Sequence, residues 1–328
     1  MSLSAVVYEA DHDAARNPGF DLDLGWLRQI RMNRSALERR AKTIGTRRTV
    51  KKQWQAAWLL RAVTLIDLTT LNSDDTPGRV ERLCAKARRS VRDDILEALG
   101  AESLRIVPAA VCVYHAFVST AVEALAGSGI PVAAVSTGFP AGLSPLKTRI
   151  AEIEASVRAG AREIDIVIER HQVLNADWKA LYDEVRAFRA ACGDAHMKTI
   201  VGSGDLATLN NVARASLVCM LAGADFIKIS TGKETTNATL PVSVAMIRMI
   251  RWFHDETGFR VGYKPAGGIS AARDALTYMA LMKDELGADW VRPELFRFGA
   301  SSLLTDIERQ LEHCATGRYA ADYRQPIP

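Results

Sequence analysis

The sequence predicts an α/β fold of the (β/α)8 class, a TIM barrel, preceded by a mainly helical extension. From about residue 63 onward, a short apolar run, a polar or glycine-rich tip and an amphipathic stretch follow one another eight times. The runs are mostly apolar on both faces, as is typical of parallel strands in a covered sheet. A doubly wound sheet would need a glycine fingerprint after its first strand, and the sequence has none. The predicted strands are 63–68, 106–113, 132–135, 163–168, 197–201, 226–229, 260–263 and 295–298.

The predicted helices lie between these runs and show ordinary start and stop signals. Pro145 and Asp205 stand where helices should begin, and Gly127, Gly160 and Gly223 stand where helices should end. The helices are expected near 77–98, 115–127, 145–159, 175–191, 205–222, 240–257, 270–287 and 301–313.

The even spacing after residue 63 gives no sign of a second domain. We therefore predict a basic helical extension over 1–60, the barrel over 61–315 and a tail over 316–328. Positive charge is concentrated near the start of the chain. The whole chain has a formal net charge of +4, whereas residues 28–61 hold eleven Lys or Arg and one acid, Glu38. That segment is therefore +10 and the remainder is −6.

This basic segment has two interpretations. It can be an arm that binds nucleic acid. It can also be a helical segment docked on a more acidic body, which the sequence favours because the segment has an apolar face to bury. That face consists of Leu27, Ile30, Leu37, Trp54, Trp58 and Leu59.

The sequence predicts a cytoplasmic protein. No run approaches the length of a membrane span, and the first thirty residues lack the pattern of a signal peptide. The cysteines are scattered, odd in number and without a CxxC pair, which favours reduced thiols over a disulfide framework. They are Cys84, Cys112, Cys192, Cys219 and Cys314.

Two lysines stand where a barrel carries its catalytic groups, at the carboxyl ends of strands. Lys228 lies in the sixth apolar run, and Lys264 follows the seventh. A buried ammonium loses its hydration and needs either a partner or a use. The use would be a neutral amine that attacks a carbonyl, with Lys228 as the nucleophile and Lys264 as the cation that lowers its pKa. The alternative is that each lysine forms an ion pair with a carboxylate such as Asp165.

Other polar side chains belong to the same strand ends. Asp165, in an apolar strand, is the candidate general acid–base. Asp67 either binds a substrate hydroxyl or has a capping role. Cys112 and Lys198 are interpreted as lining residues rather than reacting ones. The expected substrate contacts are Asp67, Thr70, Cys112, Phe139, Lys198 and Thr231.

The loops after the seventh and eighth strands predict a phosphate site, because barrels commonly bind phosphate there. Segments 265–270 and 298–304 contain glycines, which let backbone amides approach an anion, and serines that open the last helix. The alternative is simple turn and capping chemistry. The expected phosphate contacts are Gly232, Lys233, Gly267, Gly268, Gly299, Ser301 and Ser302.

Neither a metal nor another cofactor is expected. The six histidines are dispersed, and only His115 lies close to the carboxyl end of a predicted strand. No spacing of His, Asp and Glu resembles a set of metal ligands.

Seven motifs in the predicted barrel match one known family. They are Ile-Asp-Leu-Thr-Thr-Leu (66–71), Ala-Val-Cys-Val-Tyr (110–114), Thr-Gly-Phe-Pro-Ala-Gly (137–142), Glu-Ile-Asp-Ile-Val-Ile (163–168), Phe-Ile-Lys-Ile-Ser-Thr-Gly-Lys (226–233), Lys-Pro-Ala-Gly-Gly (264–268) and Phe-Gly-Ala-Ser-Ser-Leu-Leu (298–304). Together they resemble the deoxyribose-phosphate aldolases, and the resemblance covers nearly the whole chain. Segments 47–60 and 316–321 resemble the longer, animal-type members.

The resemblance implies a class I aldolase that cleaves 2-deoxy-D-ribose 5-phosphate to D-glyceraldehyde 3-phosphate and acetaldehyde, in deoxyribonucleotide catabolism. By position, Lys228 matches the Schiff-base lysine, Lys264 the lysine that perturbs it, and Asp165 the carboxylate of the proton relay. Cys112 matches a pocket cysteine, and Asp67 matches a residue near the substrate hydroxyls. The glycines and serines of the phosphate prediction fall on the family's phosphate-binding loops.

The sequence departs from the family pattern at a few places. His115 stands where a proline is usual, Ile229 replaces a threonine, and the segment Gly-Ser-Gly-Asp at 202–205 replaces a more usual Thr-Gly-Glu motif. None of these changes removes a charge that the mechanism needs. Short members place a terminal tyrosine near the site, for which Tyr319 and Tyr323 are the two candidates here.

Two alternative functions remain at this stage. One is another class I barrel, such as a transaldolase or a ketose-phosphate aldolase. The other is a nucleic-acid-binding protein that uses residues 28–61 on an inactive barrel. We expect sugar-phosphate and aldehyde substrates, neither nucleic acid nor membrane as a partner, and a homodimer as the commonest kind of assembly.

Overall fold

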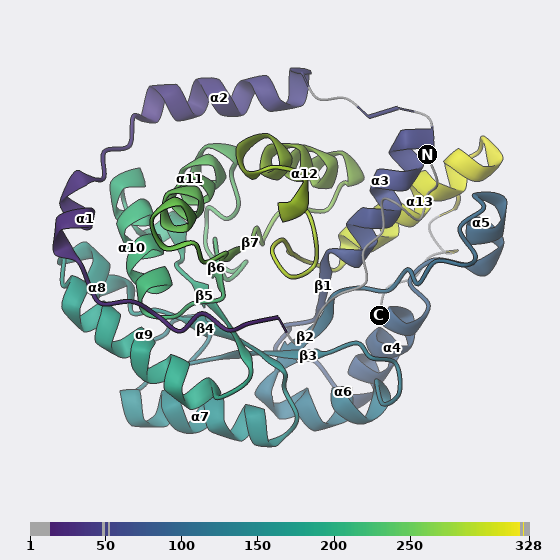
Figure 1. The fold of residues 1–328 in the computed structure, drawn as a ribbon. Coiled ribbons are helices and arrows are strands. Elements are labelled where there is room, and N and C mark those ends of the chain that lie inside the picture. Colours follow the sequence, from purple (N-terminus) through teal and green to yellow (C-terminus); the bar gives the residue numbers. More distant parts are fainter. Residues whose placement is uncertain (1–13, 48–49, 52, 322–323, 325–328) are drawn as a thin grey trace.

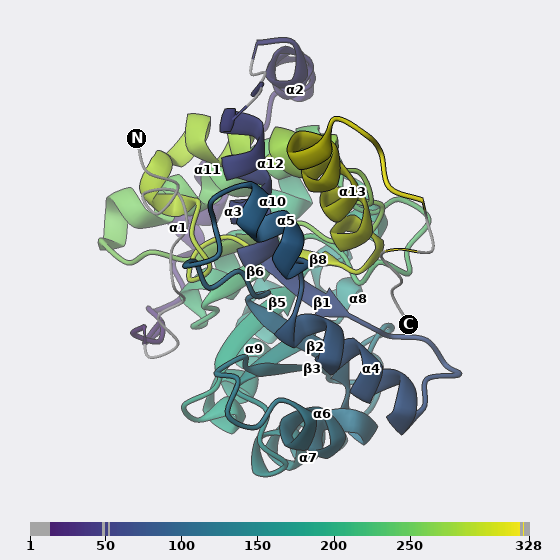
Figure 2. The same cartoon turned by 90° about the vertical axis from the view of Figure 1, so that its right-hand side faces the viewer.

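Eight parallel strands form a closed barrel within a shell of helices in the computed structural model, which describes residues 14–47, 50–51, 53–321 and 324 (Figures 1 and 2). The strands follow one another around the barrel from β1 to β7, and β8 lies beside β1. Bridges from Tyr263 to Phe296 and from Ala266 to Gly299 join the region of β8 to that of β7 and complete the cylinder. The predicted (β/α)8 class is confirmed. The strands are β1 (Ile66–Thr69), β2 (Ala110–Tyr114), β3 (Val132–Ser136), β4 (Glu163–Val167), β5 (His196–Ile200), β6 (Phe226–Lys228), β7 (Gly262–Lys264) and β8 (Phe298–Ala300).

The helices that surround the strands bury one face each against the outside of the barrel. Several begin at side-chain caps, such as Thr76 before α4 and Thr208 before α10, whose hydroxyl oxygens accept backbone hydrogen bonds. The helices are α4 (Pro77–Arg88), α5 (Asp93–Ala98), α6 (Val118–Ala124), α7 (Leu146–Arg158), α8 (Arg170–Leu174), α9 (Trp178–Cys192), α10 (Leu209–Leu221), α11 (Leu240–Thr257), α12 (Ala272–Leu286) and α13 (Ser302–Thr316).

Several strand boundaries differ from the sequence-based prediction, by most at the first, second and eighth strands. The first strand is predicted from residue 63, but Val63 and Thr64 belong to the preceding helix, α3 (Gln53–Thr64). The second is predicted from residue 106, but β2 begins at Ala110. The eighth is predicted over 295–298, but β8 begins at the last of these residues. The backbone N–H groups of Leu295 and Phe296 both donate to the carbonyl of Arg292, which makes a turn there instead.

The helix predictions need several corrections, and the sequence misses the short helix α8 altogether. The helix predicted over 77–98 is two helices, because α4 ends where the backbone N–H of Arg89 caps Lys86 and α5 begins four residues later. Asp205 does not begin a helix; it closes a short 3-10 turn, and α10 begins at Leu209. Pro145 does precede the first residue of α7, as predicted.

The extension docks on the barrel through α1 (Leu24–Gln29), α2 (Arg34–Arg47) and α3. Helix α2 lies across α11 and α12, and α3 packs against α12 and α13 (Figures 1 and 2). Leu37 of α2 is buried, and the guanidinium of Arg40 pairs with Asp284 at 3.2 Å and Glu285 at 2.8 Å. The segment is therefore docked on the barrel, with Arg40 paired to acidic side chains of α12, as the favoured interpretation predicts. Trp54 departs from that interpretation, since it is 47% exposed.

The inside of the barrel is divided between apolar and charged side chains. On the side of β2 and β3, a small apolar cluster packs without charges, and its buried members are Leu71, Ala110, Cys112, Ala133 and Val135. On the side of β4 to β7, the inward positions carry carboxylates and lysines. Because an unpaired buried charge is strongly destabilising, the charged side must be paired internally.

No helix in the described part of the chain has both the length and the apolar character needed to cross a membrane. All five cysteines are free thiols; four are buried and Cys314 is exposed.

Candidate active site

The inward-facing residues of the central strands bring three lysines and a carboxylate together. On β4 and β5, Asp165 pairs in register with Lys198, and on β6 and β7, Lys228 pairs in register with Lys264. Successive side chains of a strand point to opposite faces, so these register partners all project into the barrel. All four side chains are at least 97% buried.

Asp165 is the centre of this arrangement. Its Oδ2 accepts hydrogen bonds from Lys228 Nζ at 2.8 Å and from Lys264 Nζ at 2.7 Å, and its Oδ1 accepts one from Lys198 Nζ at 3.2 Å. One carboxylate thus contacts all three predicted lysines. The ion pair that the sequence offered as an alternative to catalysis is present, and it joins both candidate lysines to the candidate proton carrier.

Asp67 on β1 takes part in the same network. Its carboxylate contacts Lys264 Nζ at 2.5 Å and Lys198 Nζ at 3.5 Å. Its other oxygen accepts a hydrogen bond from Arg297 Nη1 at 2.6 Å. The side chain is fully buried, and both of its carboxylate oxygens contact cations inside the barrel rather than capping the loop that follows β1. The nearby hydroxyl of Thr69 donates to the backbone carbonyl of Asp67 instead.

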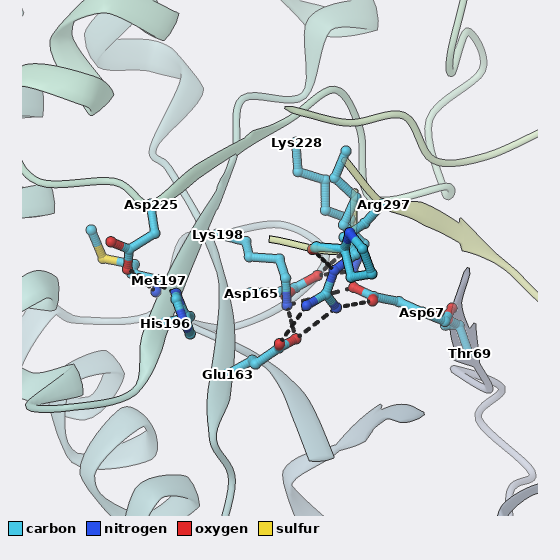
Figure 3. A network of polar contacts seen from close by, with 12 residues as sticks. Asp67, Thr69, Glu163, Asp165, His196, Met197, Lys198, Asp225, Lys228 and Arg297 are labelled. Carbon is cyan, nitrogen blue, oxygen red and sulfur yellow. Dashed lines mark hydrogen bonds and ion pairs between the residues drawn. The ribbon is translucent and has the colours of Figure 1, made fainter. Parts of the chain in front are cut away.

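Sequence reasoning missed two members of the network, Glu163 and Arg297. Arg297 Nη2 donates to Glu163 Oε1 at 3.0 Å, and Lys198 Nζ also donates to Glu163 (Figure 3). Glu163 could have been found, because it stands two residues before Asp165 and must therefore share its face of the strand. Arg297 precedes β8 in a segment whose strand boundaries the sequence misplaces, and its position gives no such signal.

The network shifts the pKa values of the two candidate lysines in opposite directions. Burial lowers the pKa of Lys228, and the nearby Lys264 ammonium lowers it further, which the Asp165 carboxylate only partly offsets. Burial also acts to lower the pKa of Lys264, but the Asp165 and Asp67 carboxylates outweigh it and raise that pKa above its usual value. The amine of Lys228 is therefore the easier of the two to deprotonate.

The carboxylates respond in the opposite direction. Burial acts to raise the pKa of Asp165, but the three surrounding lysines outweigh it and hold the pKa well below its usual range. The pKa of Asp67 is likewise lowered, because Lys264, Lys198 and Arg297 outweigh the effect of burial. Both groups are ionised at neutral pH, so neither holds a proton before substrate arrives.

The charge balance of the network favours a neutral Lys228. Its four cationic side chains face three carboxylates, which leaves an excess of one positive charge when every group is ionised. An uncompensated charge inside a protein is strongly unfavourable. Loss of one proton from Lys228 removes the excess and leaves the remaining ion pairs intact.

A cavity of about 220 Å³ opens above Lys228 at the carboxyl end of the strands. Of the predicted substrate contacts, Thr70 and Thr231 line it, but the Thr70 hydroxyl already donates to the Asp75 carboxylate at 2.8 Å. Phe139 is not among the lining residues, although Lys228 Nζ is 6.0 Å from the centre of its ring. Cys112 and Lys198 lie deeper in the barrel and are not among the lining residues.

Five of the seven predicted phosphate contacts line the same cavity. Gly232 and Gly267 line it with positive φ angles of +85° and +81°, a backbone conformation that favours glycine. At Gly299 an added Cβ would stand 2.9 Å from the Cβ of Ala266, so the two loops approach closely. The remaining predicted contacts that line the cavity are Lys233 and Ser301. Gly268 and Ser302 are not among its lining residues.

The structure also locates the departures from the family pattern. The ring of His115 contacts the Ser156 hydroxyl at 3.0 Å, on the outside of the barrel between β2 and α7. Tyr319 is 62% exposed and stacks on His313 at the end of α13, with the ring centres 4.3 Å apart. Tyr323 lies outside the described residues. Within the described part of the chain, no three His, Cys, Asp or Glu side chains converge as metal ligands do.

The chain is similar to a group of known aldolases. The sequence profile of the DeoC/LacD family of aldolases matches residues 61–308. The chain is 57% identical over 316 residues to the deoxyribose-phosphate aldolase of Homo sapiens, which covers 96% of this chain and 99% of that protein. The Mus musculus protein of the same name is similar to the same extent. The solved deoxyribose phosphate aldolase of Aeropyrum pernix, 21% identical, covers 88% of this chain and all of its own with a TM-score of 0.60, a likeness of fold alone.

Proposed function

The chain belongs to the DeoC/LacD family of aldolases, and from this premise we propose that Lys228 forms a Schiff base with the open-chain form of 2-deoxy-D-ribose 5-phosphate. The activity is that of a deoxyribose-phosphate aldolase, a carbon–carbon lyase. Its products are D-glyceraldehyde 3-phosphate and acetaldehyde. One observation carries the proposal: Lys228 is the lysine of lowered pKa in the network, and it is also the one that lines the cavity.

The first step is attack of the neutral Lys228 amine on the C1 aldehyde of the substrate. The amine nitrogen bonds to C1, and the carbonyl oxygen takes up a proton to give a carbinolamine. Loss of water then gives an iminium ion that joins the nitrogen to C1. Lys264 stays charged because it pairs with two carboxylates, so it cannot compete as the nucleophile.

The second step breaks the C2–C3 bond. The C3 hydroxyl loses its proton to the Asp165 carboxylate through a water molecule, and C3 becomes the aldehyde carbon of glyceraldehyde 3-phosphate. The bonding electrons move toward the iminium, which becomes an enamine. Protonation of the enamine at C2 and hydrolysis release acetaldehyde and restore the Lys228 amine. Asp165 is suited to a transient role of this kind, because its lysine neighbours make it give up the proton readily.

The phosphate group of the substrate would lie against residues 232–233 and 267 and the loop that contains Gly299 and Ser301. Backbone amides and the Lys233 ammonium there would hold the dianion at a fixed distance from Lys228. Binding energy from this remote group orients C1 for attack.

Reductive trapping tests the proposal directly. Acetaldehyde with borohydride should attach a two-carbon adduct to Lys228, found by mass spectrometry, and Lys228→Arg should abolish both the adduct and acetaldehyde release. Lys179→Arg, at an exposed lysine of α9, is the matched control. An adduct on another lysine, or equal activity in Lys228→Arg, would defeat the mechanism. Dihydroxyacetone phosphate should leave no adduct, which separates this activity from that of a ketose-phosphate aldolase.

We also propose a cytoplasmic location and a homodimer. The location is supported by the free state of all five cysteines, which suits a reducing compartment. The dimer rests only on the general prevalence of two-fold assemblies. Cell fractionation and sedimentation velocity test the two statements, and a secreted protein or a monomer at working concentration would refute them.

A further inference from the structure

Arg170, the first residue of α8, joins three of the loops at the mouth of the barrel. Its guanidinium donates to the backbone carbonyl of Ala141 at 3.0 Å in the loop after β3. It contacts Asp205 at 3.1 Å in the loop after β5, and it donates to Glu234 Oε1 at 3.0 Å in the loop after β6. The Arg170 side chain is 15% exposed and that of Glu234 is 3% exposed, so the contact between these two is largely shielded from water.

Glu234 carries the connection into the cavity. Its carboxylate accepts hydrogen bonds from the backbone N–H of Thr231 at 3.0 Å and from the Thr231 hydroxyl at 2.8 Å. The Thr231 hydroxyl in turn accepts a hydrogen bond from the backbone N–H of Lys233 at 3.1 Å. The Glu234 side chain is only 3% exposed, and Arg170 is the cation that pairs with it. The conformation of residues 231–233, which line the cavity, is thus fixed by a chain of contacts that ends at Arg170.

The segment at 202–205, which departs from the family pattern, makes room for this arginine. Gly202 has a positive φ of +63°, and an added Cβ would stand 2.2 Å from Arg170 Nε. At Gly204 an added Cβ would stand 2.2 Å from the backbone carbonyl oxygen of Thr236. Two glycines therefore let the loop after β5 close against both Arg170 and the loop after β6.

We propose that Arg170 is a positioning residue that holds residues 231–233 in their anion-binding conformation and thereby sets the affinity for the phosphate end of the substrate. It does not touch the reacting atoms. When the charge of Arg170 is removed, the buried carboxylate of Glu234 loses its cationic partner and tends to turn toward solvent. This movement releases the Thr231 amide and hydroxyl. The proposal rests on the phosphate-binding role given above to residues 232–233.

The test compares KM and kcat for deoxyribose 5-phosphate with kcat/KM for unphosphorylated 2-deoxyribose. Arg170→Met should raise KM for the phosphorylated sugar by at least about tenfold, with a much smaller change in kcat and in kcat/KM for the unphosphorylated sugar. Arg170→Lys should recover part of the loss, because it restores the charge but not the forked donors. Arg158→Met, at an arginine of α7 that is 69% exposed, is the matched control.

A double variant tests the route through Glu234. Arg170→Met combined with Glu234→Gln should raise KM less than Arg170→Met alone, because no buried carboxylate then lacks a cation. An equal fall in activity toward both sugars, or a lowered Tm with KM unchanged, would overturn the proposal and leave Arg170 a structural residue.

The variant Lys233→Met distinguishes a failure of the positioning role of Arg170 from a failure of the phosphate site on which that role depends. If that variant raises KM for the phosphorylated sugar and Arg170→Met does not, the phosphate site stands and the positioning role falls. If neither variant changes KM, the phosphate site itself is wrong and the positioning role falls with it.

Discussion

Replacing Lys264 with methionine should shift the pH at which kcat/KM rises, and not only lower the value of kcat/KM. Lys228 Nζ and Lys264 Nζ bond to the same oxygen of Asp165 at 2.8 and 2.7 Å, so the two nitrogens are at most 5.5 Å apart, the sum of these distances. Two unit charges at about that distance repel by about 3 kcal/mol when the effective dielectric constant is about 20. Loss of this repulsion makes the Lys228 amine hold its proton about 100-fold more tightly.

The sign of the effect follows from the role of Lys228. The nucleophile is the neutral amine, so activity rises as pH increases through its pKa, and Lys264→Met raises that pKa. At neutral pH we expect kcat/KM to fall by about 100-fold, with much of the loss recovered toward high pH.

The assay is acetaldehyde release from deoxyribose 5-phosphate between pH 6 and pH 10, coupled to an alcohol dehydrogenase that is kept in excess. Lys179→Met is the matched control, at a lysine whose side chain is 73% exposed. A loss that is uniform across the pH range would refute the reasoning, since it would mean that Lys264 acts in another way than by repelling the charge on Lys228.

Three further predictions concern the barrel interior. Glu163→Gln should lower the free energy of unfolding in urea by about 3–5 kcal/mol, because it removes one carboxylate partner from a buried guanidinium and from a buried ammonium and raises the excess positive charge of the network; a change below about 1 kcal/mol would contradict the buried pairing. The three barrel carboxylates all have a pKa lowered in the folded state, so the stability they contribute is present above about pH 4 and is lost as the pH falls further; thermal unfolding should show Tm dropping steeply below about pH 4, and a flat profile would argue against it. Iodoacetamide should alkylate Cys314 long before Cys112, because burial shields Cys112 and raises the pKa of its thiol to about 11; equal rates by peptide mass spectrometry would show that the interior is open.

The fold can be predicted from the sequence because apolar runs and amphipathic stretches reflect which residues are buried, and this pattern is local to each segment. Lys228, Lys264 and Asp165 can be identified as candidate site residues from the sequence, because a charged residue within or at the end of an apolar run is unusual. The short strands are harder to delimit, since β6, β7 and β8 have three residues each and their ends depend on hydrogen bonds to neighbours. A pattern within one segment cannot report such bonds.

Ion pairs between residues that are distant in the sequence also cannot be predicted from a local sequence pattern. Glu163 has a periodic signal, but its partner Arg297 is 134 residues away along the chain. The link from Arg170 to Glu234 spans 64 residues and joins two loops whose conformations are not encoded in hydrophobic periodicity. In the extension the apolar face is visible in the sequence, whereas its acidic partners Asp284 and Glu285 are not.

The position of Arg297 has a consequence for biosynthesis. Arg297 and Lys198 both contact Asp67 and Glu163, and Arg297 is encoded more than two hundred residues after Asp67. A nascent chain still short of this arginine lacks the guanidinium that hydrogen-bonds both carboxylates, and it also lacks β8, which pairs with β1 in the barrel. The ribosome must therefore deliver nearly the entire polypeptide before the cylinder can seal, and closure in this enzyme is a late event.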